Sequence, residues 1–208
     1  MKPWESANLS ELESLKGPGT LRWSPVRRRF GITTVGVNAY TATEAGQDVV
    51  EEHTEQTLGH EELYVVVTGH ATFTLDGEEL DAPAGTLVFL SDPSVKRSAK
   101  AVEPGTTVLA VGGKPGQHDP STWEWFFAAY AYADEGDTAR GLAEIEEGLA
   151  VKPDNPVLLY HLACMNSRLG RLDEARSALD RAVALDGKYA EWAETDEDLE
   201  PLRVAGQP

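Results

Sequence analysis

Short apolar runs separated by turn-forming residues fill the first half of the chain. The runs, rich in Val, Thr, Phe and Tyr, lie at residues 32–40, 60–67, 71–75, 86–90 and 106–111. Their composition and their spacing of about ten residues are typical of β-strands, and no helical period separates them. Asp76-Gly77 follows one alternating run and predicts a tight hairpin turn. The pattern therefore predicts an antiparallel barrel or sandwich over residues 20–112.

The second half of the chain has the pattern of helices. Beyond a stretch rich in Gly and Pro, the residues Ala, Leu, Glu and Arg become frequent. Four helices are predicted, at residues 121–134, 138–151, 156–169 and 172–185. We therefore predict an α+β protein of several parts. In chain order they are an N-terminal segment (1–19) with a short helix at 10–16, a β-domain (20–112), a linker (113–120), a helical domain (121–200) and a tail (201–208).

The helical half repeats itself with a period of 34 residues. A shift of 34 positions places Gly136 on Gly170, Gly141 on Ala175 and Gly148 on Ala182. Small residues thus recur where paired helices must approach closely, and the period resembles the tetratricopeptide repeat over residues 122–189. The resemblance implies two helical hairpins, closed by a polar capping helix at 190–200. Such repeats typically bind peptides, so a protein partner is one expectation, and packing against the β-domain is another.

Composition adds several exclusions. The chain has 35 acidic and 18 basic residues, a formal charge of −17, and residues 119–208 hold 19 of the acidic and 8 of the basic ones. Because such a surface repels phosphate groups, nucleic acid and anionic membranes are unsuitable partners. No apolar run is long enough to span a bilayer, and the first residues lack the apolar segment of a signal peptide. The single cysteine, Cys164, allows no internal disulfide and indicates a cytoplasmic protein.

Histidine and glutamate residues gather in one short window of the β-domain, at residues 51–62. In the strand that begins at His60, alternation places His60, Glu62 and Tyr64 on the same face. One face of a closed barrel is its interior, where an imidazole and a carboxylate are costly to bury without a partner. A divalent metal or a hydrogen-bonded ligand would remove this cost.

The same window resembles the first motif of the cupin family, G-x5-H-x-H-x3,4-E-x6-G. Glu62 and Gly69 match the glutamate and the last glycine of the motif, with six residues between them. His53 and Glu55 stand where the motif has its pair of histidines.

The spacing of this first motif departs from the family pattern in two places. Six residues rather than five separate Gly46 from His53. The stretch from Glu55 to Glu62 is two or three residues longer than usual, and the extra length contains His60.

The second cupin motif, G-x5-P-x-G-x2-H-x3-N, matches in part. Gly77 is followed after five residues by Pro83 and then by Gly85, in full agreement with the motif. Val88 occupies the histidine position and Asp92 the asparagine position. The resemblance implies an antiparallel β-barrel of the cupin, or jelly-roll, type, followed by an all-α repeat of helical hairpins.

The family's usual metal ligands are three histidines and one glutamate. Of these, His53 and Glu62 carry over directly, Glu55 would replace a histidine, and His60 would supply a further nitrogen. Such a set suits iron, manganese, nickel or zinc. The alternative is a metal-free cupin, in which the two histidines hydrogen-bond to carboxylates or face solvent.

Two functions are compatible with these features. In the first, the protein is a small-molecule enzyme, with the cluster either binding a metal or using Glu62 and His60 as an acid/base pair while Tyr64 orients the substrate. Isomerase, lyase and oxygenase reactions all stay open. In the second, it is a non-catalytic ligand-sensing or protein-interaction module whose helical domain binds a partner. A homodimer is a further expectation, because unpaired strand edges need covering.

Overall fold

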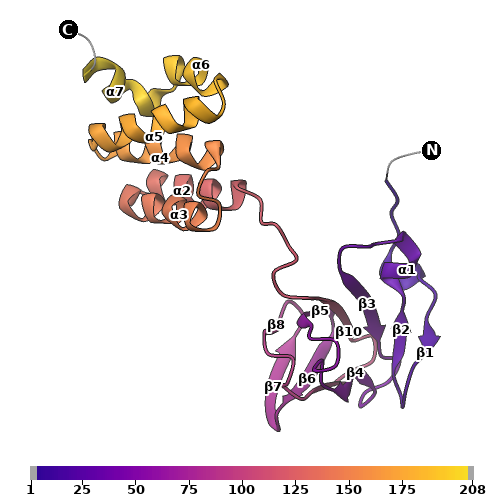
Figure 1. Ribbon diagram of the computed structural model, residues 1–208. Coiled ribbons are helices and arrows are strands. Elements are labelled where there is room, and N and C mark those ends of the chain that lie inside the picture. The colour runs from indigo at the N-terminus through magenta and orange to yellow at the C-terminus, as the bar shows by residue number, and fades with distance from the viewer. Residues whose placement is uncertain (1–3, 206–208) are drawn as a thin grey trace. The chain divides into compact units, whose positions relative to one another are not determined.

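The chain changes from strands to helices at a division between His118 and Asp119 (Figure 1). The computed structural model describes residues 4–205. We call the part up to His118 the β-unit and the part from Asp119 onward the helical unit. No helix within residues 4–205 is long and apolar enough to cross a membrane.

Two antiparallel sheets make up the β-unit. One has six strands in the order β1-β2-β3-β10-β5-β8, and the other has four in the order β4-β9-β6-β7. The strands are β1 (Leu15–Lys16), β2 (Arg22–Ser24), β3 (Gly36–Thr41), β4 (Asp48–His53), β5 (Glu61–Thr68), β6 (His70–Leu75), β7 (Glu78–Pro83), β8 (Leu87–Leu90), β9 (Arg97–Ala101) and β10 (Thr107–Gly113). The predicted antiparallel β-fold is confirmed, built as two sheets rather than as one continuous barrel.

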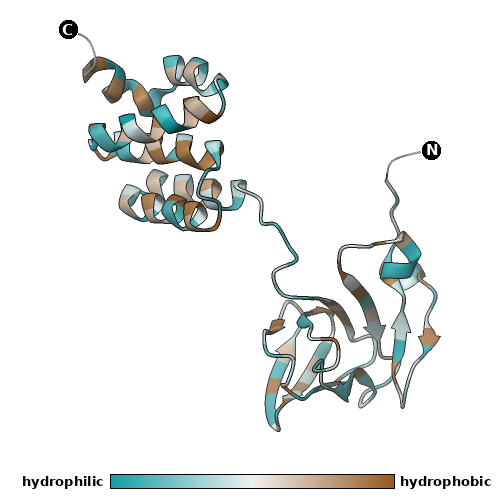
Figure 2. Cartoon of the chain, in the orientation of Figure 1, coloured by the Kyte–Doolittle hydropathy of each residue, from teal (hydrophilic) through white to brown (hydrophobic). Residues whose placement is uncertain are grey.

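Alternation along the strands fills the space between the two sheets. In β6, Ala71 and Phe73 are fully buried, whereas the threonines beside them are partly exposed. Tyr64 and Val66 of β5 and Val108 of β10 join them in one apolar core. Figure 2 shows the resulting mixture of hydrophobic and hydrophilic positions along each strand.

The turn predicted at Asp76-Gly77 joins β6 to β7. Asp76 has a φ of 49° and Gly77 a φ of 90°. A two-residue hairpin turn of this kind needs positive φ at both central positions, which Asp and Gly adopt at low cost. The register that follows places Leu75 opposite Glu78.

Four elements of the β-unit differ from the expectation. The helix expected at residues 10–16 is a single 3-10 turn, η1 (Leu9–Glu11), because the following residues pair with β2 as strand β1. A short helix, α1 (Val26–Phe30), lies in the region predicted to hold strands, and Val26 packs against Val37. Strands β4 and β9 were not predicted, since charged residues interrupt their apolar pattern.

The helical unit consists of helical hairpins followed by a cap. Its elements are α2 (Trp123–Asp134), α3 (Thr138–Val151), α4 (Pro156–Arg168), α5 (Leu172–Leu185), α6 (Lys188–Thr195), η2 (Glu197–Leu199) and α7 (Glu200–Ala205). The four predicted helices agree with α2 to α5 to within two residues at each end. Gly136 and Gly170, which are 34 residues apart, both adopt a positive φ in the turns that the repeat requires.

The sequence pattern predicted a tail at residues 201–208, but residues 201–205 are helical. Residues up to Ala205 belong to α7, and Leu202 is buried in the same core as Tyr189 and Leu199. Arg203 donates hydrogen bonds to the Ala193 and Asp196 carbonyl oxygens, so the cap is longer than the sequence pattern indicated. Residues 206–208 lie outside the described part.

Gly141 provides a test of the close helix approach in the first hairpin. A Cβ added there would lie 2.5 Å from the Ala129 carbonyl oxygen, so α2 and α3 would have to separate. We expect Gly141→Ala to lower the free energy of unfolding by about 1–3 kcal/mol, despite the higher helix propensity of alanine. Urea unfolding followed by far-UV circular dichroism measures the change.

Gly187→Ala is the matched control, because a Cβ at Gly187 meets nothing within 4 Å. It should change the free energy of unfolding by less than about 0.5 kcal/mol. A Gly141→Ala protein as stable as the wild type would contradict the close approach.

Candidate functional site

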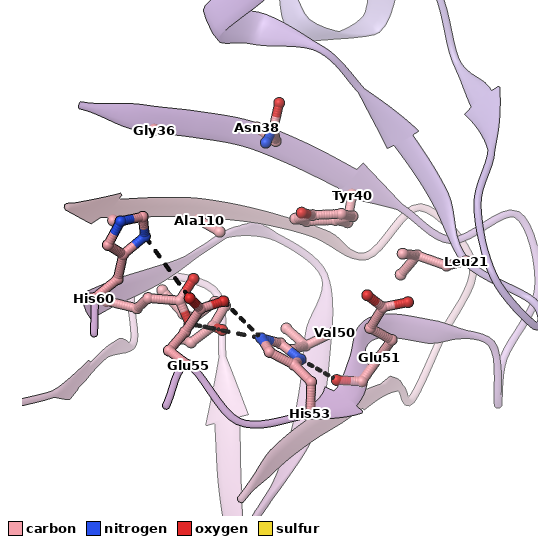
Figure 3. A pocket seen from close by; sticks show the side chains of 13 residues that line it. Leu21, Gly36, Asn38, Tyr40, Val50, Glu51, His53, Glu55, His60 and Ala110 are labelled. Atoms are coloured by element: carbon pink, nitrogen blue, oxygen red, sulfur yellow. Dashed lines mark hydrogen bonds and ion pairs between the residues drawn. The ribbon is translucent and has the colours of Figure 1, made fainter. Parts of the chain in front are cut away.

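A pocket of about 280 Å³ lies between the two sheets, lined from β3, β5 and β10 on one side and from β4 on the other (Figure 3). Its ionisable and aromatic lining residues are Tyr40, Glu51, His53, Glu55, His60, Glu62 and Tyr64. All five residues that sequence analysis selected as candidates therefore line the same pocket.

Strand β4 presents side chains to the pocket from an irregular stretch. Against β9, it has one residue more than its partner between Asp48 and Val50, and one more between Val50 and His53. Such bulges bend a strand and re-aim its side chains, so that Val50, Glu51 and His53 all line the pocket. The additional residue between Gly46 and His53 is accommodated within this irregular strand.

His53 approaches two carboxylates. Its Nε2 atom lies 3.6 Å from Glu55 Oε1 and 3.8 Å from Glu62 Oε2. Its Nδ1 atom lies 2.7 Å from the Glu51 carbonyl oxygen, which can only accept a hydrogen bond, so Nδ1 carries a proton. This contact orients the ring and directs Nε2 to the carboxylates.

His60 lies on the other side of Glu55. Its Nδ1 atom is 3.7 Å from Glu55 Oε2, and no hydrogen bond or ion pair joins these two described residues, His60 and Glu62. One donor atom from each of His53, Glu55 and Glu62 falls within 4.8 Å of the others, and His60 is not part of this group. Of the four predicted metal ligands, the structure thus brings three together.

Glu62 is a largely buried carboxylate, with 14% of its side chain exposed. It accepts a hydrogen bond from the Tyr64 hydroxyl, and its Oε2 atom lies 3.8 Å from Arg97 Nε. Burial alone would raise the pKa of Glu62, but the nearby His53 imidazole, the hydrogen bond from Tyr64 and the charge of Arg97 outweigh it and lower the pKa. The nearby Glu62 carboxylate is in turn the largest of the contributions that raise the pKa of His53.

Sequence analysis missed Arg97. It lies on β9 opposite His53, its side chain is fully buried, and none of its nitrogen atoms has a hydrogen-bond partner among residues 4–205. Ala99 and Ala101 share its inward face. The available signal was this alternation of arginine with alanines, since small residues leave room for a long side chain between the sheets.

Val88, at the histidine position of the second motif, supplies no ligand. It pairs with Tyr64 across β5 and β8 and belongs to the apolar core. His70 also lies apart from the pocket, with Nε2 2.6 Å from Asp81 Oδ1.

The three grouped residues fit a divalent cation. They offer one imidazole nitrogen and carboxylate oxygens, which are the donors that transition metals take in proteins. Glu55 Oε2 is buried and has no hydrogen-bond partner in the described part of the chain, as expected of an oxygen that serves a cation.

Comparison with known proteins finds separate matches for the two types of fold. The tetratricopeptide repeat family matches residues 132–195. Similar solved structures include a cupin protein from Bacteroides fragilis, at 21% identity and a TM-score of 0.46, covering 59% of this chain and 94% of that one. KdgF from Halomonas sp. has 17% identity and a TM-score of 0.41, covering 50% and 88%. A sugar phosphate isomerase of the cupin superfamily from Silicibacter pomeroyi has 16% identity and a TM-score of 0.44, covering 53% and 76%.

No curated protein matches the chain by sequence. The chain joins a cupin-like β-unit, with its two sheets and its partial motifs, to a helical unit of tetratricopeptide type.

The pair of His53 and Glu62 contributes to the stability of the protein over a limited range of pH. Because the pKa of His53 is raised, the stability that His53 contributes is lost as the pH rises through this pKa. Because the pKa of Glu62 is lowered, the stability that Glu62 contributes is lost as the pH falls through the pKa of Glu62. The pair therefore stabilises the β-unit most between the two pKa values.

Replacing the carboxylate tests this coupling. We expect Glu62→Gln to lower the pKa of His53 towards the ordinary value of about 6.5, because the largest cause of the increase is removed. NMR titration of the histidine ring protons in metal-free protein measures it. Asp81→Asn, which alters the partner of His70 only, should leave the His53 titration unchanged. An unchanged His53 pKa in Glu62→Gln would contradict the proposed coupling.

Proposed function

We propose that the β-unit is a small-molecule-binding cupin whose pocket holds a divalent metal on His53, Glu55 and Glu62. The observation that carries this proposal is the approach of His53 Nε2 to both carboxylates, at 3.6 and 3.8 Å, in the wall of the pocket. Two carboxylates this close to one imidazole attract positive charge to that point. A divalent cation bound by one oxygen of each carboxylate and by His53 Nε2 supplies that charge.

The donor set narrows the choice of metal. One nitrogen and two carboxylates favour manganese, iron or zinc, and three protein ligands leave coordination positions for a ligand. When bound, such a metal would act as a Lewis acid on a ligand oxygen.

The residues around the set have separate roles in this proposal. Tyr64 donates a hydrogen bond to Glu62 through its hydroxyl, so it positions that carboxylate rather than the substrate. His60 is half-buried in the pocket wall, 3.7 Å from Glu55, and is the side chain available to carry a proton to or from a bound molecule. The proposed reaction is therefore a proton transfer on a small molecule, of the isomerase or lyase type.

A second candidate function is the non-catalytic module, in which the helical unit binds a protein partner. The observation in its favour is the exposure of large aromatic side chains on the first helix of the unit. Trp123 is 52% and Phe127 59% exposed, and the two rings contact each other. Ligand binding in the β-unit is common to both candidates.

Metal analysis tests the proposed site. We expect protein purified without chelator, then supplied with manganese, iron or zinc, to retain close to one equivalent. His53→Ala and Glu62→Gln should retain less than about a tenth of an equivalent, because each removes one of three ligands. His70→Ala is the matched control and should retain the wild-type amount, since His70 lies outside the pocket. Wild-type protein that retains less than a tenth of an equivalent of every metal would overturn the proposal.

A further inference from the structure

Glu51 is a pocket carboxylate that the proposed metal set does not use. Its backbone carbonyl accepts the proton of His53 Nδ1, but its carboxylate has no hydrogen bond or ion pair with any residue from 4 to 205. In Figure 3 this carboxylate lies on the side of the pocket formed by Leu21 and Tyr40, and His60 lies at the opposite end. Glu51 is thus placed to contact a part of a ligand that the metal does not reach.

The wall of the pocket is acidic. Glu51, Glu55 and Glu62 line it, and none of the described lining residues is a lysine or an arginine. Arg97 is fully buried behind Glu62 and does not line the pocket. A divalent metal would balance the charges of Glu55 and Glu62 and leave that of Glu51. The Glu51 end therefore attracts cations and repels anions such as phosphate groups.

The neighbours of Glu51 strengthen this preference. Leu21 and Val50 are buried apolar lining residues, which lower the local dielectric and make charge interactions stronger. Tyr40 adds an aromatic ring, and burial, followed by the charges of Glu62 and Glu51, raises its pKa to about 12. Tyr40 therefore stays neutral, and an aromatic face is a favourable neighbour for an ammonium group.

We propose that the pocket binds a small molecule that carries a protonated amine, and that Glu51 is the residue that selects this group. This inference rests on the proposed function, because it takes the same pocket as the ligand site. A carboxylate accepts hydrogen bonds and donates none, and its bond to a charged donor is stronger than its bond to a hydroxyl. An amine is therefore preferred over the corresponding alcohol.

Butylammonium and butanol test the selection, since they share a chain length and differ in the charge of the head group. Each is titrated into the full-length protein in the presence of zinc, which is diamagnetic, and the amide signals of β3 and β4 are followed by NMR. The proteins are the wild type, Glu51→Gln and Glu52→Gln. Glu52 is the matched control, because it is the next residue on β4 but its side chain is 65% exposed and pairs with Lys96 at 2.7 Å.

We expect the wild type and Glu52→Gln to bind butylammonium with a dissociation constant in the millimolar range and to bind butanol more weakly. Glu51→Gln should bind butylammonium about tenfold more weakly or worse, because a charge-assisted hydrogen bond is lost. Equal binding of butylammonium by Glu51→Gln and Glu52→Gln overturns the inference. So does the absence of saturable shifts in the wild type up to about 0.1 M, since even a very small ligand should bind below that concentration in a suitable pocket.

Zinc titration of the same three proteins separates this inference from the proposed metal site. Glu51→Gln should bind zinc as tightly as the wild type, because Glu51 is not part of the ligand group. If the wild type binds no metal but still binds butylammonium through Glu51, the metal site fails and the inference stands. If metal binds and butylammonium binding does not depend on Glu51, the inference alone fails.

Discussion

The rest of the candidate site depends on the carboxylate of Glu62, which is kept ionised between the two sheets. Glu62 and Tyr64 come from β5 in one sheet, and His53 and Arg97 come from β4 and β9 in the other. Without these contacts, burial would favour the protonated form, which would bind neither a metal nor the His53 imidazole as strongly. Buried ion pairs contribute little net stability compared with apolar packing, so the charges are better understood as parts of a site than as supports of the fold.

The apolar core of the β-unit explains where this site ends. Val66, Phe73 and Val108 fill the interior beyond Tyr64, and Val88 joins them opposite the tyrosine ring. Because Val88 stands where the cupin motif has a histidine, the donors come only from β4, β5 and the loop between them. The candidate donors His53, Glu55 and Glu62 lie close together, whereas Glu51 and Tyr40 line the pocket outside this group.

The helices and several strands could be predicted from the sequence because they depend on local patterns. The period of 34 residues and the paired small residues define α2 to α5, and Asp76-Gly77 defines one hairpin. The window at residues 51–62 was also visible, because motif spacing is a property of the chain alone. Arg97 was not, because its meaning depends on a neighbour 35 residues away on a different strand. The placement of His60 beside Glu55 rather than Glu62 depends on the loop, whose path no periodicity describes.

The two places where the chain departs from the cupin motif spacing, in β4 and before β5, contribute side chains to the pocket. The extra length of β4 is taken up by bulges, and these bring Glu51 into the wall beside His53. The longer segment before β5 is fixed where the Glu55 amide donates to the Pro93 carbonyl oxygen at 2.9 Å, and the Gly59 amide donates to that of Glu55 at 2.7 Å. These hydrogen bonds hold the insertion in one conformation. An insertion held in this way adds side chains to a site without disturbing the sheets, since the cost of a longer loop grows only slowly with its length. The same scaffold can therefore exchange a histidine for a glutamate and acquire a second imidazole while its core stays apolar.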